Sequence, residues 1–456
     1  MRSPVRLLAQ LIAFVALLGI CAQPVAAQAI LRDAETEALL KDLVNPLVEA
    51  AGMPRGSVDV VLVQDSSINA FVAGGQRIYV HSGLINAADN ANEVQGVLAH
   101  ELGHITGGHS LSIYQGAGNA TKIQLISLLA SVAAALAGAP AEAAMAGMAM
   151  GQQAALSSFL SFSRTQESSA DAASVTFLSK AGITGKGSVA FFKKLQNYEF
   201  RYGYSQSDEA GYARTHPLTG DRISRLEADF QKDPAWDTPP DPQLQTRFER
   251  IKAKLYGYLA EPAKTLNAYP AYVNTVPAHY ARAYAYHKQS KMAEALAETD
   301  ALLAADPDDP YFLELKGQVL LESGKPRDAL EPLREATQMT GNDPLIASTF
   351  GLALLATEDN AHLAEAEQVL KAAVARDREN PMAWYQLGMV YGARGDIPRA
   401  RLASAEQQIM SGNARAALQN AEAAEHTLPQ GTADWIRAQD ISLQARAELE
   451  RARNRN

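Results

Sequence analysis

The sequence predicts a mostly α protein of two domains, an α+β domain with a small sheet followed by an all-α repeat solenoid. Its 456 residues exceed what one core usually organises, since a domain commonly holds about 100–200 residues. Apolar residues recur at helical spacing in most segments, and the two short strand patterns are confined to residues 58–80. Prolines that return every 33 to 37 residues after residue 277 indicate a helical repeat.

The first 29 residues have the layout of a secretory signal peptide. Arg2 and Arg6 give a basic start, residues 7–22 are apolar, and Ala27-Gln28-Ala29 is a small-residue cleavage site. We expect the mature chain to begin near Gln28 or Ile30. The alternative is that the apolar stretch stays as a membrane anchor.

Charge and cysteine content exclude several kinds of site. The only cysteine, Cys21, lies inside the signal, so the mature chain has no disulfide framework and no thiolate metal ligand. A transition metal must therefore be held by histidines and carboxylates. The formal net charge of −9, without a dense basic stripe, argues against nucleic acid as a partner.

The N-terminal domain is expected to alternate helices and strands. Residues 33–52 read as an amphipathic helix with Asp33 as its N-cap, and residues 58–62 and 77–80 read as strands. We expect residues 78–80 to be an edge strand to which an extended substrate adds. A helix follows at 92–106 and ends at two glycines.

Two later segments mark the organisation of the chain. Residues 123–138 are apolar and Ala-rich, which favours a buried hairpin or an interfacial helix with peripheral membrane contact over a true membrane span. Residues 233–242 contain the run Asp-Thr-Pro-Pro-Asp-Pro and read as a linker, followed by a helix at 243–259.

A series of repeats begins after this helix. Pro277, Pro310, Pro344 and Pro381 each stand where a helix pair is expected to start, since proline at a helix start loses no hydrogen bond. The series resembles the tetratricopeptide repeat family over residues 270–450, with extra residues at 361–365 and a loose last unit at 411–428. Such arrays bind peptides or partner helices.

The pentapeptide His100-Glu101-Leu102-Gly103-His104 lies in the helix expected at 92–106. Residues four apart share one helix face, so His100 and His104 can hold one divalent ion, for which zinc is the best match. Glu101 can then act as general base toward an attacking water. The alternative is a pair of ordinary surface histidines.

A third ligand is required, and Glu167 on a downstream helix is the best candidate. Asp171 lies one turn further on the same face and can accept a hydrogen bond from a ligating histidine. His109, five residues after His104, is a rival third ligand, although capping or packing near the helix end is favoured for it.

Residues 33–226 resemble the gluzincin metallopeptidase family that includes HtpX and the CAAX prenyl proteases. The resemblance implies a zincin-like α+β metallopeptidase domain with one Zn²⁺ per chain, held by His100, His104 and Glu167. It rests on the five-residue helix motif and on Asn69-Ala-Phe71, Gly74-Gly75, Gly83-Leu84, Ser163-Arg164, Glu167-x-x-Ala-Asp171 and Thr215-His216-Pro217.

The same resemblance implies roles for two further residues. His216 matches a loop histidine that can take the fourth zinc position and hold the enzyme latent, although the sequence alone shows only a turn. Arg222 matches an arginine suited to stabilising the oxyanion that forms during peptide hydrolysis.

These observations lead to one function and two alternatives. We expect a signal at 1–29, a zinc metallopeptidase domain at 30–262 and tetratricopeptide repeats at 270–450. The resemblance implies a periplasmic endopeptidase acting on unfolded or stalled outer-membrane proteins, with the repeats recruiting substrate or the outer-membrane assembly machinery. The alternatives are a chaperone or scaffold with a latent peptidase site, and a peptidase anchored in the inner membrane.

Overall fold

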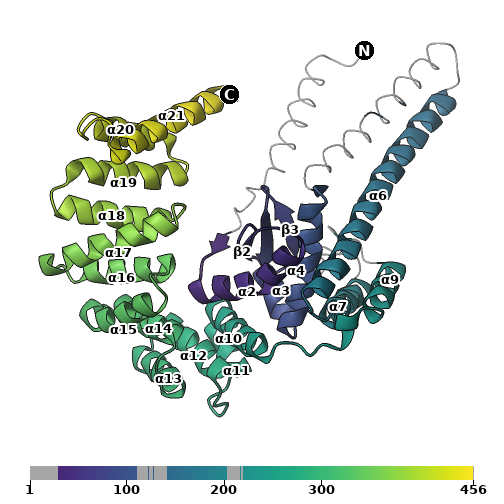
Figure 1. The fold of residues 1–456 in the computed structure, drawn as a ribbon, viewed down its shortest axis with the longest axis horizontal. Coiled ribbons are helices and arrows are strands. Elements are labelled where there is room, and N and C mark those ends of the chain that lie inside the picture. Colours follow the sequence, from purple (N-terminus) through teal and green to yellow (C-terminus); the bar gives the residue numbers. More distant parts are fainter. Residues whose placement is uncertain are drawn as a thin grey trace, which may run out of the picture.

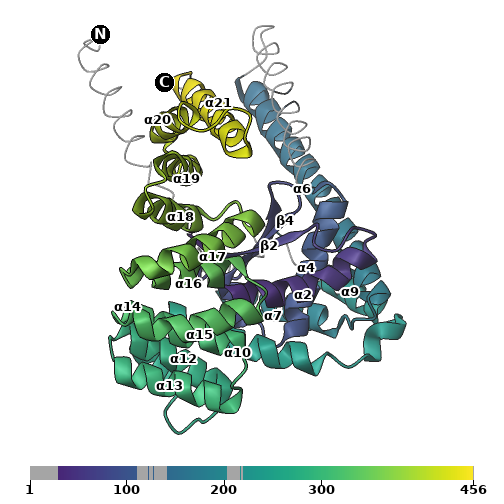
Figure 2. The ribbon, with the colours of Figure 1, turned by 60° about the vertical axis from the view of Figure 1, so that its left-hand side comes forward.

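The computed structural model describes residues 29–109, 122, 127, 141–202, 216 and 219–454. Figure 1 shows a unit built around a small sheet, followed by a stack of helix pairs that continues to the C-terminus. Seen from a second direction, the sheet still lies between this stack and the long helix α6 (Ala141–Lys180) (Figure 2). The predicted fold class, mostly α with a sheet-containing first domain and an all-α solenoid, is confirmed.

Four strands form the sheet in the order β1-β2-β4-β3. They are β1 (Ala29–Leu31), β2 (Asp59–Gln64), β3 (Ala70–Ala73) and β4 (Arg77–His81). β4 pairs in parallel with β2 and antiparallel with β3, so the prediction that residues 78–80 form an edge strand is wrong. The reason is the turn at Gly74 and Gly75, whose positive φ angles are 65° and 97°. This turn reverses the chain, so the short β3 pairs alongside β4 and covers its outer edge.

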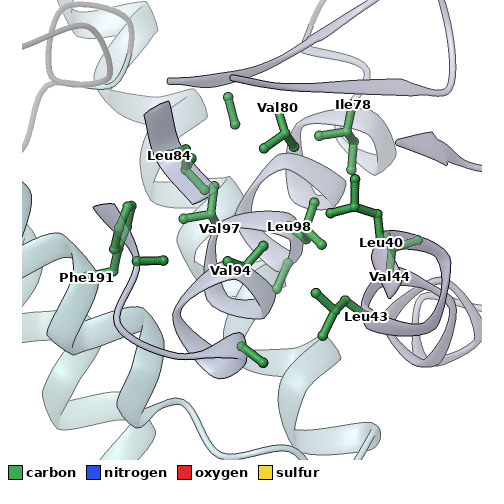
Figure 3. Packing of buried hydrophobic residues seen from close by; sticks show 14 of the residues in the cluster. Leu40, Leu43, Val44, Ile78, Val80, Leu84, Val94, Val97, Leu98 and Phe191 are labelled. Atoms are coloured by element: carbon green, nitrogen blue, oxygen red, sulfur yellow. The ribbon is translucent and has the colours of Figure 1, made fainter. Parts of the chain in front are cut away.

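Two helices cover the sheet and build the core of the first domain. The helix α2 (Ala34–Ala50) is capped as predicted by Asp33, whose Oδ1 accepts from the Thr36 backbone N–H at 2.8 Å. The helix α4 (Ala91–Thr106) follows the short α3 (Ser82–Ala87) and is capped by Asn90. Figure 3 shows their apolar side chains meeting those of β4, all of them buried: Leu40, Leu43, Val44, Ile78, Val80, Val94, Val97 and Leu98.

Close contacts between helices hold α4 between α6 and α7 (Lys186–Tyr202). A Cβ built on Gly96 would lie 2.5 Å from the Ser188 Cα of α7. One built on Gly103 would lie 2.7 Å from the Ala170 carbonyl oxygen of α6. Both contacts involve backbone atoms, so glycine is required for these helices to approach α4 so closely.

The helix α10 (Pro242–Leu259) joins the two domains after the turn η2 (Pro234–Asp237). It contributes to the first core and packs against α12 (Val276–Lys288). At this junction the buried Glu35 carboxylate accepts hydrogen bonds from Arg250 and, at 3.2 and 2.8 Å, from Lys254 Nζ and Tyr280 Oη. A buried charge network therefore links α2, the first helix in the described residues, to the first repeats.

The C-terminal half is a stack of antiparallel helix pairs, and each proline predicted to open a repeat stands in the first or second residue of a helix. The extra residues expected at 361–365 are partly taken up by the turn η3 (Asn360–His362), which keeps the helix pair intact. The other helices are α11 (Pro262–Ala268), α13 (Met292–Ala305), α14 (Pro310–Glu322), α15 (Pro326–Met339), α16 (Pro344–Ala356), α17 (Leu363–Arg376), α18 (Pro381–Ala393), α19 (Ile397–Met410), α20 (Ala414–Glu425) and α21 (Ala433–Arg453).

Two predicted segments fall outside the part of the chain that the structure describes. Residues 1–28 of the predicted signal do so, and so does the apolar segment 123–138 apart from Ser127. Within the described ranges, no helix has both the length and the apolar character needed to cross a bilayer.

Candidate metal centre

Three residues of the predicted catalytic motif lie on the buried face of α4. His100 and Glu101 have no solvent exposure, and His104 is 8% exposed. The four-residue spacing places both imidazoles on the same side of the helix, with their Nε2 atoms 3.1 Å apart. The α4 segment thus presents two imidazole nitrogens and, beside them, one carboxylate.

The helix α6 brings a second carboxylate to these histidines. Ala170 of α6 packs directly on Gly103 of α4, and this close approach carries Glu167, one turn earlier, into the site. The Glu167 oxygens lie 3.4 Å from His100 Nε2 and 3.4 Å from His104 Nε2. At 6% exposure, Glu167 is buried among the histidines rather than solvated.

His216 completes the cluster from the segment that precedes α9 (Gly220–Gln231). Its Nδ1 lies 3.1 Å from a Glu167 oxygen and 3.4 Å from His100 Nε2. Its other ring nitrogen, Nε2, lies 3.5 Å from a Glu101 oxygen. The ring therefore lies between the ligand cluster and Glu101.

The four side chains together fit a transition-metal ion. One ligand atom from each of His100, His104, Glu167 and His216 can be chosen so that all lie within 4.8 Å of one another. His100 Nε2 faces two other ring nitrogens at 3.1 and 3.4 Å, and one proton cannot satisfy both contacts. A cation satisfies them all, and three nitrogens with one oxygen match the donors that zinc prefers.

Asp171 and Arg222 surround this cluster. An Asp171 oxygen lies 3.0 Å from His100 Nδ1, on the side of the ring that faces away from the other ligands. Arg222 on α9 binds both Asp171 oxygens, through Nε at 2.5 Å and Nη2 at 2.8 Å, and its Nη1 lies 2.8 Å from Glu167. One guanidinium thus links the carboxylate of Glu167, a candidate ligand, to the carboxylate that lies beside His100.

Burial and these contacts shift the pKa values of the cluster strongly. Burial, together with the neighbouring His100 and His216, lowers the pKa of His104 to about 3. Burial alone would lower the pKa of His100, but hydrogen bonds to Asp171 and Glu167 raise it to about 9. Burial alone would raise the pKa of Glu167, but hydrogen bonds from the histidines hold it far below its usual value. A bound cation would replace the proton on His100.

His109 lies behind His104 and outside the ligand group. Its Nδ1 is 2.9 Å from His104 Nδ1, the ring nitrogen opposite the one that faces Glu167. Its side chain is buried, and burial lowers its pKa. The four-residue group formed by the described residues does not contain His109.

The structure brings together the residues that the sequence singled out for the site, which come from the helices α4, α6 and α9 and from His216. Phe192 of α7 also contributes, and sequence reasoning missed it. Its ring meets the His100 ring edge-on at 5.8 Å and lies beneath the Arg222 guanidinium at 5.7 Å. An apolar residue in an amphipathic helix gives no signal that separates this role from ordinary core packing.

Comparisons with known proteins agree with this geometry. Residues 34–229 match Peptidase family M48. The Beta-barrel assembly-enhancing protease of Yersinia pestis is 24% identical over 82% of this chain and 76% of its own length. Its namesake in Escherichia coli K12 is also 24% identical, over 80% and 74%. Metalloprotease YcaL of the same bacterium is 28% identical over 37% of this chain and 61% of its own.

Some solved structures are also similar to part of this chain. YrrB, described as a TPR protein with an unusual peptide-binding site, is 22% identical and covers 38% of this chain and 91% of its own, with a TM-score of 0.32. MamA is 21% identical and covers 38% and 96%, with a TM-score of 0.29.

Proposed function

We propose that this metalloendopeptidase, whose first domain is of the M48 type, uses zinc in the bacterial periplasm to cleave misfolded or stalled outer-membrane proteins and assists their assembly. The observation that carries the proposal is the buried convergence of His100, His104, Glu167 and His216 beside Glu101. The name of the relatives similar over some 80% of the chain, Beta-barrel assembly-enhancing protease, supports the substrate class and the compartment.

The residues of the site divide the chemistry between them. His100, His104 and Glu167 would hold the ion, which when bound polarises a peptide carbonyl and makes water acidic near neutral pH. Glu101 would accept the proton of the attacking water and deliver it to the leaving amine. Its complete burial keeps this carboxylate out of bulk water, so the proton transfer takes place in a site of low dielectric.

Arg222 supplies the positive charge of the site. Its Nη2 lies 3.5 Å from His100 Nε2, so the guanidinium reaches the edge of the ligand cluster while it binds Asp171 and Glu167. We propose that it holds both carboxylates in place and stabilises the oxyanion of the reacting peptide.

The edge strand β3 is the element that we propose for substrate binding. The Asn69 carbonyl accepts from the His81 N–H at 3.0 Å, so alternate residues of β3 face β4, and the backbone groups of Ala70 and Val72 point outward. β3 also lies against α4, which carries the catalytic motif. An extended polypeptide could add to this edge through backbone hydrogen bonds with little sequence preference.

The repeats are proposed to recruit the unfolded substrate or its assembly machinery. A cavity of about 790 Å³ lies between the start of the described chain and the first helices of several repeats. Large apolar side chains of α16 and α18 remain exposed: Leu352 and Met382 line this cavity, and Tyr385 and Met389 lie further along α18. Exposed apolar groups on a helical array suit the binding of a polypeptide that has not buried its own.

A second candidate function is a scaffold with a latent peptidase site, and the position of His216 favours it. This ring would take a fourth ligand position that a catalytic metal usually leaves to water or substrate. The two candidates are reconciled if His216 holds the resting enzyme latent and leaves the cluster during catalysis. Peptide cleavage should then be faster in a His216→Ala variant than in the parent.

The proposed function is tested by comparing the parent with a Glu101→Gln variant. Both are loaded with zinc and mixed with an unfolded outer-membrane β-barrel protein or, separately, with an unfolded soluble protein. The variant should bind one zinc ion per chain like the parent and lose cleavage by about 10²–10⁴-fold, because it lacks the general base.

A Glu49→Gln variant serves as the matched control, because Glu49 is half exposed and its ion pair with Arg55 lies on the surface. It should cleave like the parent. If Glu101→Gln keeps every activity of the parent, the scaffold function is correct. If the parent binds no zinc, the proposed metal centre is wrong.

A further inference from the structure

His109 is buried against the end of α4, with its ring beside that of His104. The helix α4 ends at Thr106, and the chain then reverses through Gly108, whose φ of 64° is left-handed. The reversal turns the His109 ring back against the helix end, where it is only 8% exposed. A Cβ built on Gly107 would lie 2.3 Å from His109 Nε2, so the ring occupies the space that a side chain at residue 107 would need.

The ring that His109 contacts belongs to a metal ligand. His104 turns Nε2 toward Glu167 and His100, at 3.4 and 3.1 Å, so Nε2 must carry the lone pair that binds a cation. In a neutral imidazole the proton is then on Nδ1. That Nδ1 is the atom 2.9 Å from His109 Nδ1.

The arrangement at His104 parallels the one at His100. The Asp171 carboxylate lies 3.0 Å from His100 Nδ1 and orients that ring from behind. His104 has an imidazole, His109, in the equivalent place. Each ligand that α4 supplies is therefore braced on the side away from the ligand cluster.

We propose that His109 is a positioning residue: its Nδ1 accepts a hydrogen bond from His104 Nδ1–H, which fixes the tautomer and orientation in which His104 binds the metal. Gly107 and Gly108 provide the space and the reversal that bring this acceptor into place. The inference rests on the metal centre of the proposed function, but not on the proposed substrate.

The test measures the affinity of the full-length chain for zinc alone, by competition with a chelating dye, in three variants of residue 109. His109→Ala should weaken zinc binding by about 10–100-fold, the usual cost of losing such a partner. His109→Asn should restore most of the affinity, because its amide oxygen can take the place of Nδ1. His109→Gln should stay weak, because its amide corresponds to the position of Nε2.

A second arm uses the glycine that shapes the pocket. Gly107→Ala removes no donor or acceptor side chain, yet its Cβ would displace the His109 ring, so zinc affinity should fall to a similar extent. Combined with His109→Ala, it should cause little further loss, because both changes remove the same hydrogen bond. A purely structural effect of the two changes would instead be additive.

Controls separate this inference from the proposed function. His279→Ala removes a hydrogen-bonded histidine of the repeats and should leave zinc affinity unchanged. Zinc X-ray absorption should count the same number of imidazoles in the parent and in His109→Ala. The inference is overturned if His109→Ala binds zinc as tightly as the parent, or if His109→Asn does not restore more zinc affinity than His109→Gln. It is also overturned if the zinc of His109→Ala has one imidazole ligand fewer than that of the parent. A parent that binds no zinc overturns the proposed metal centre as well.

Discussion

Replacing Gly103 with alanine should damage the metal centre without touching a ligand. The new Cβ would lie 2.7 Å from the Ala170 carbonyl oxygen and 2.8 Å from its Cα. Ordinary contacts of a Cβ begin near 3.4 Å, so relieving the shorter contact requires α4 and α6 to separate by about 0.7 Å. Because both obstructing atoms are backbone, no side-chain rotation can relieve the contact.

The separation has two measurable consequences. Overpacking of this kind costs about 1–3 kcal/mol of stability, which lowers Tm by roughly 2–4 °C per kcal/mol in a domain of this size. Glu167 lies one turn from Ala170 on the same helix and moves with it, and metal sites tolerate displacements of only about 0.5 Å. We expect zinc affinity to fall by about tenfold or more.

The assay compares Gly103→Ala with Gly96→Ala, a matched change on the same helix. The Cβ of Gly96→Ala would lie 2.5 Å from the Ser188 Cα of α7, and none of the proposed ligands comes from α7. Both variants should lose stability in thermal unfolding followed by circular dichroism. Gly103→Ala should lose more zinc affinity in a chelator competition, because it displaces the proposed ligand Glu167, whereas Gly96→Ala displaces α7, whose Phe192 only packs against the His100 ring. Equal zinc affinities in the two variants would refute the reasoning.

Three further predictions concern other parts of the molecule. Glu35→Gln should destabilise the chain by about 3 kcal/mol in urea unfolding, because it leaves Arg250 and Lys254 buried without the carboxylate that they share. The control Glu49→Gln, at an exposed ion pair, should cost less than about 1 kcal/mol. Similar losses of stability in the two variants would contradict this prediction. Burial alone would raise the pKa of Asp171, but Arg222 and His100 lower it to about 2. In the metal-free chain, the ionised Asp171 should therefore contribute about 2 kcal/mol to the free energy of unfolding above pH 4, and this contribution should vanish as the pH falls toward 2. An Asp171→Asn variant with the same acid unfolding curve as the parent would rule this out. Val72→Pro removes one outward N–H of β3 and should slow cleavage of an extended peptide more than Val72→Ala does, with zinc affinity unchanged; equal rates would exclude substrate addition at this edge.

Local sequence patterns were sufficient for most elements. The predicted helix at 92–106 is α4 (Ala91–Thr106), and the prolines at 310, 344 and 381 each stand first in a helix. These signals are local, because a cap, a helical stripe or a proline acts on its own turn. The strands β1 and β3 were not predicted, since three or four residues give too short an alternating pattern.

The site divides in the same way. The spacing of His100 and His104 follows from helix geometry alone, whereas Glu167 and His216 were proposed from context and resemblance. Their meeting depends on how α6 packs against α4 and on where His216 lies. The sequence shows that Gly103 is small, but not that Ala170 lies against it.

The sequence by itself determined most of the elements, the repeat and the chemical types of the candidate ligands, because periodicity, capping and spacing are properties of neighbouring residues. Only the tertiary structure decided which strands lie at the sheet edges, what lies behind the rings of the candidate ligands, and that His109 faces the back of His104. These are contacts between groups placed by a chain reversal or by separate helices. They depend on differences of a few tenths of an ångström in the distances between packed groups, for which a linear sequence pattern carries no signal.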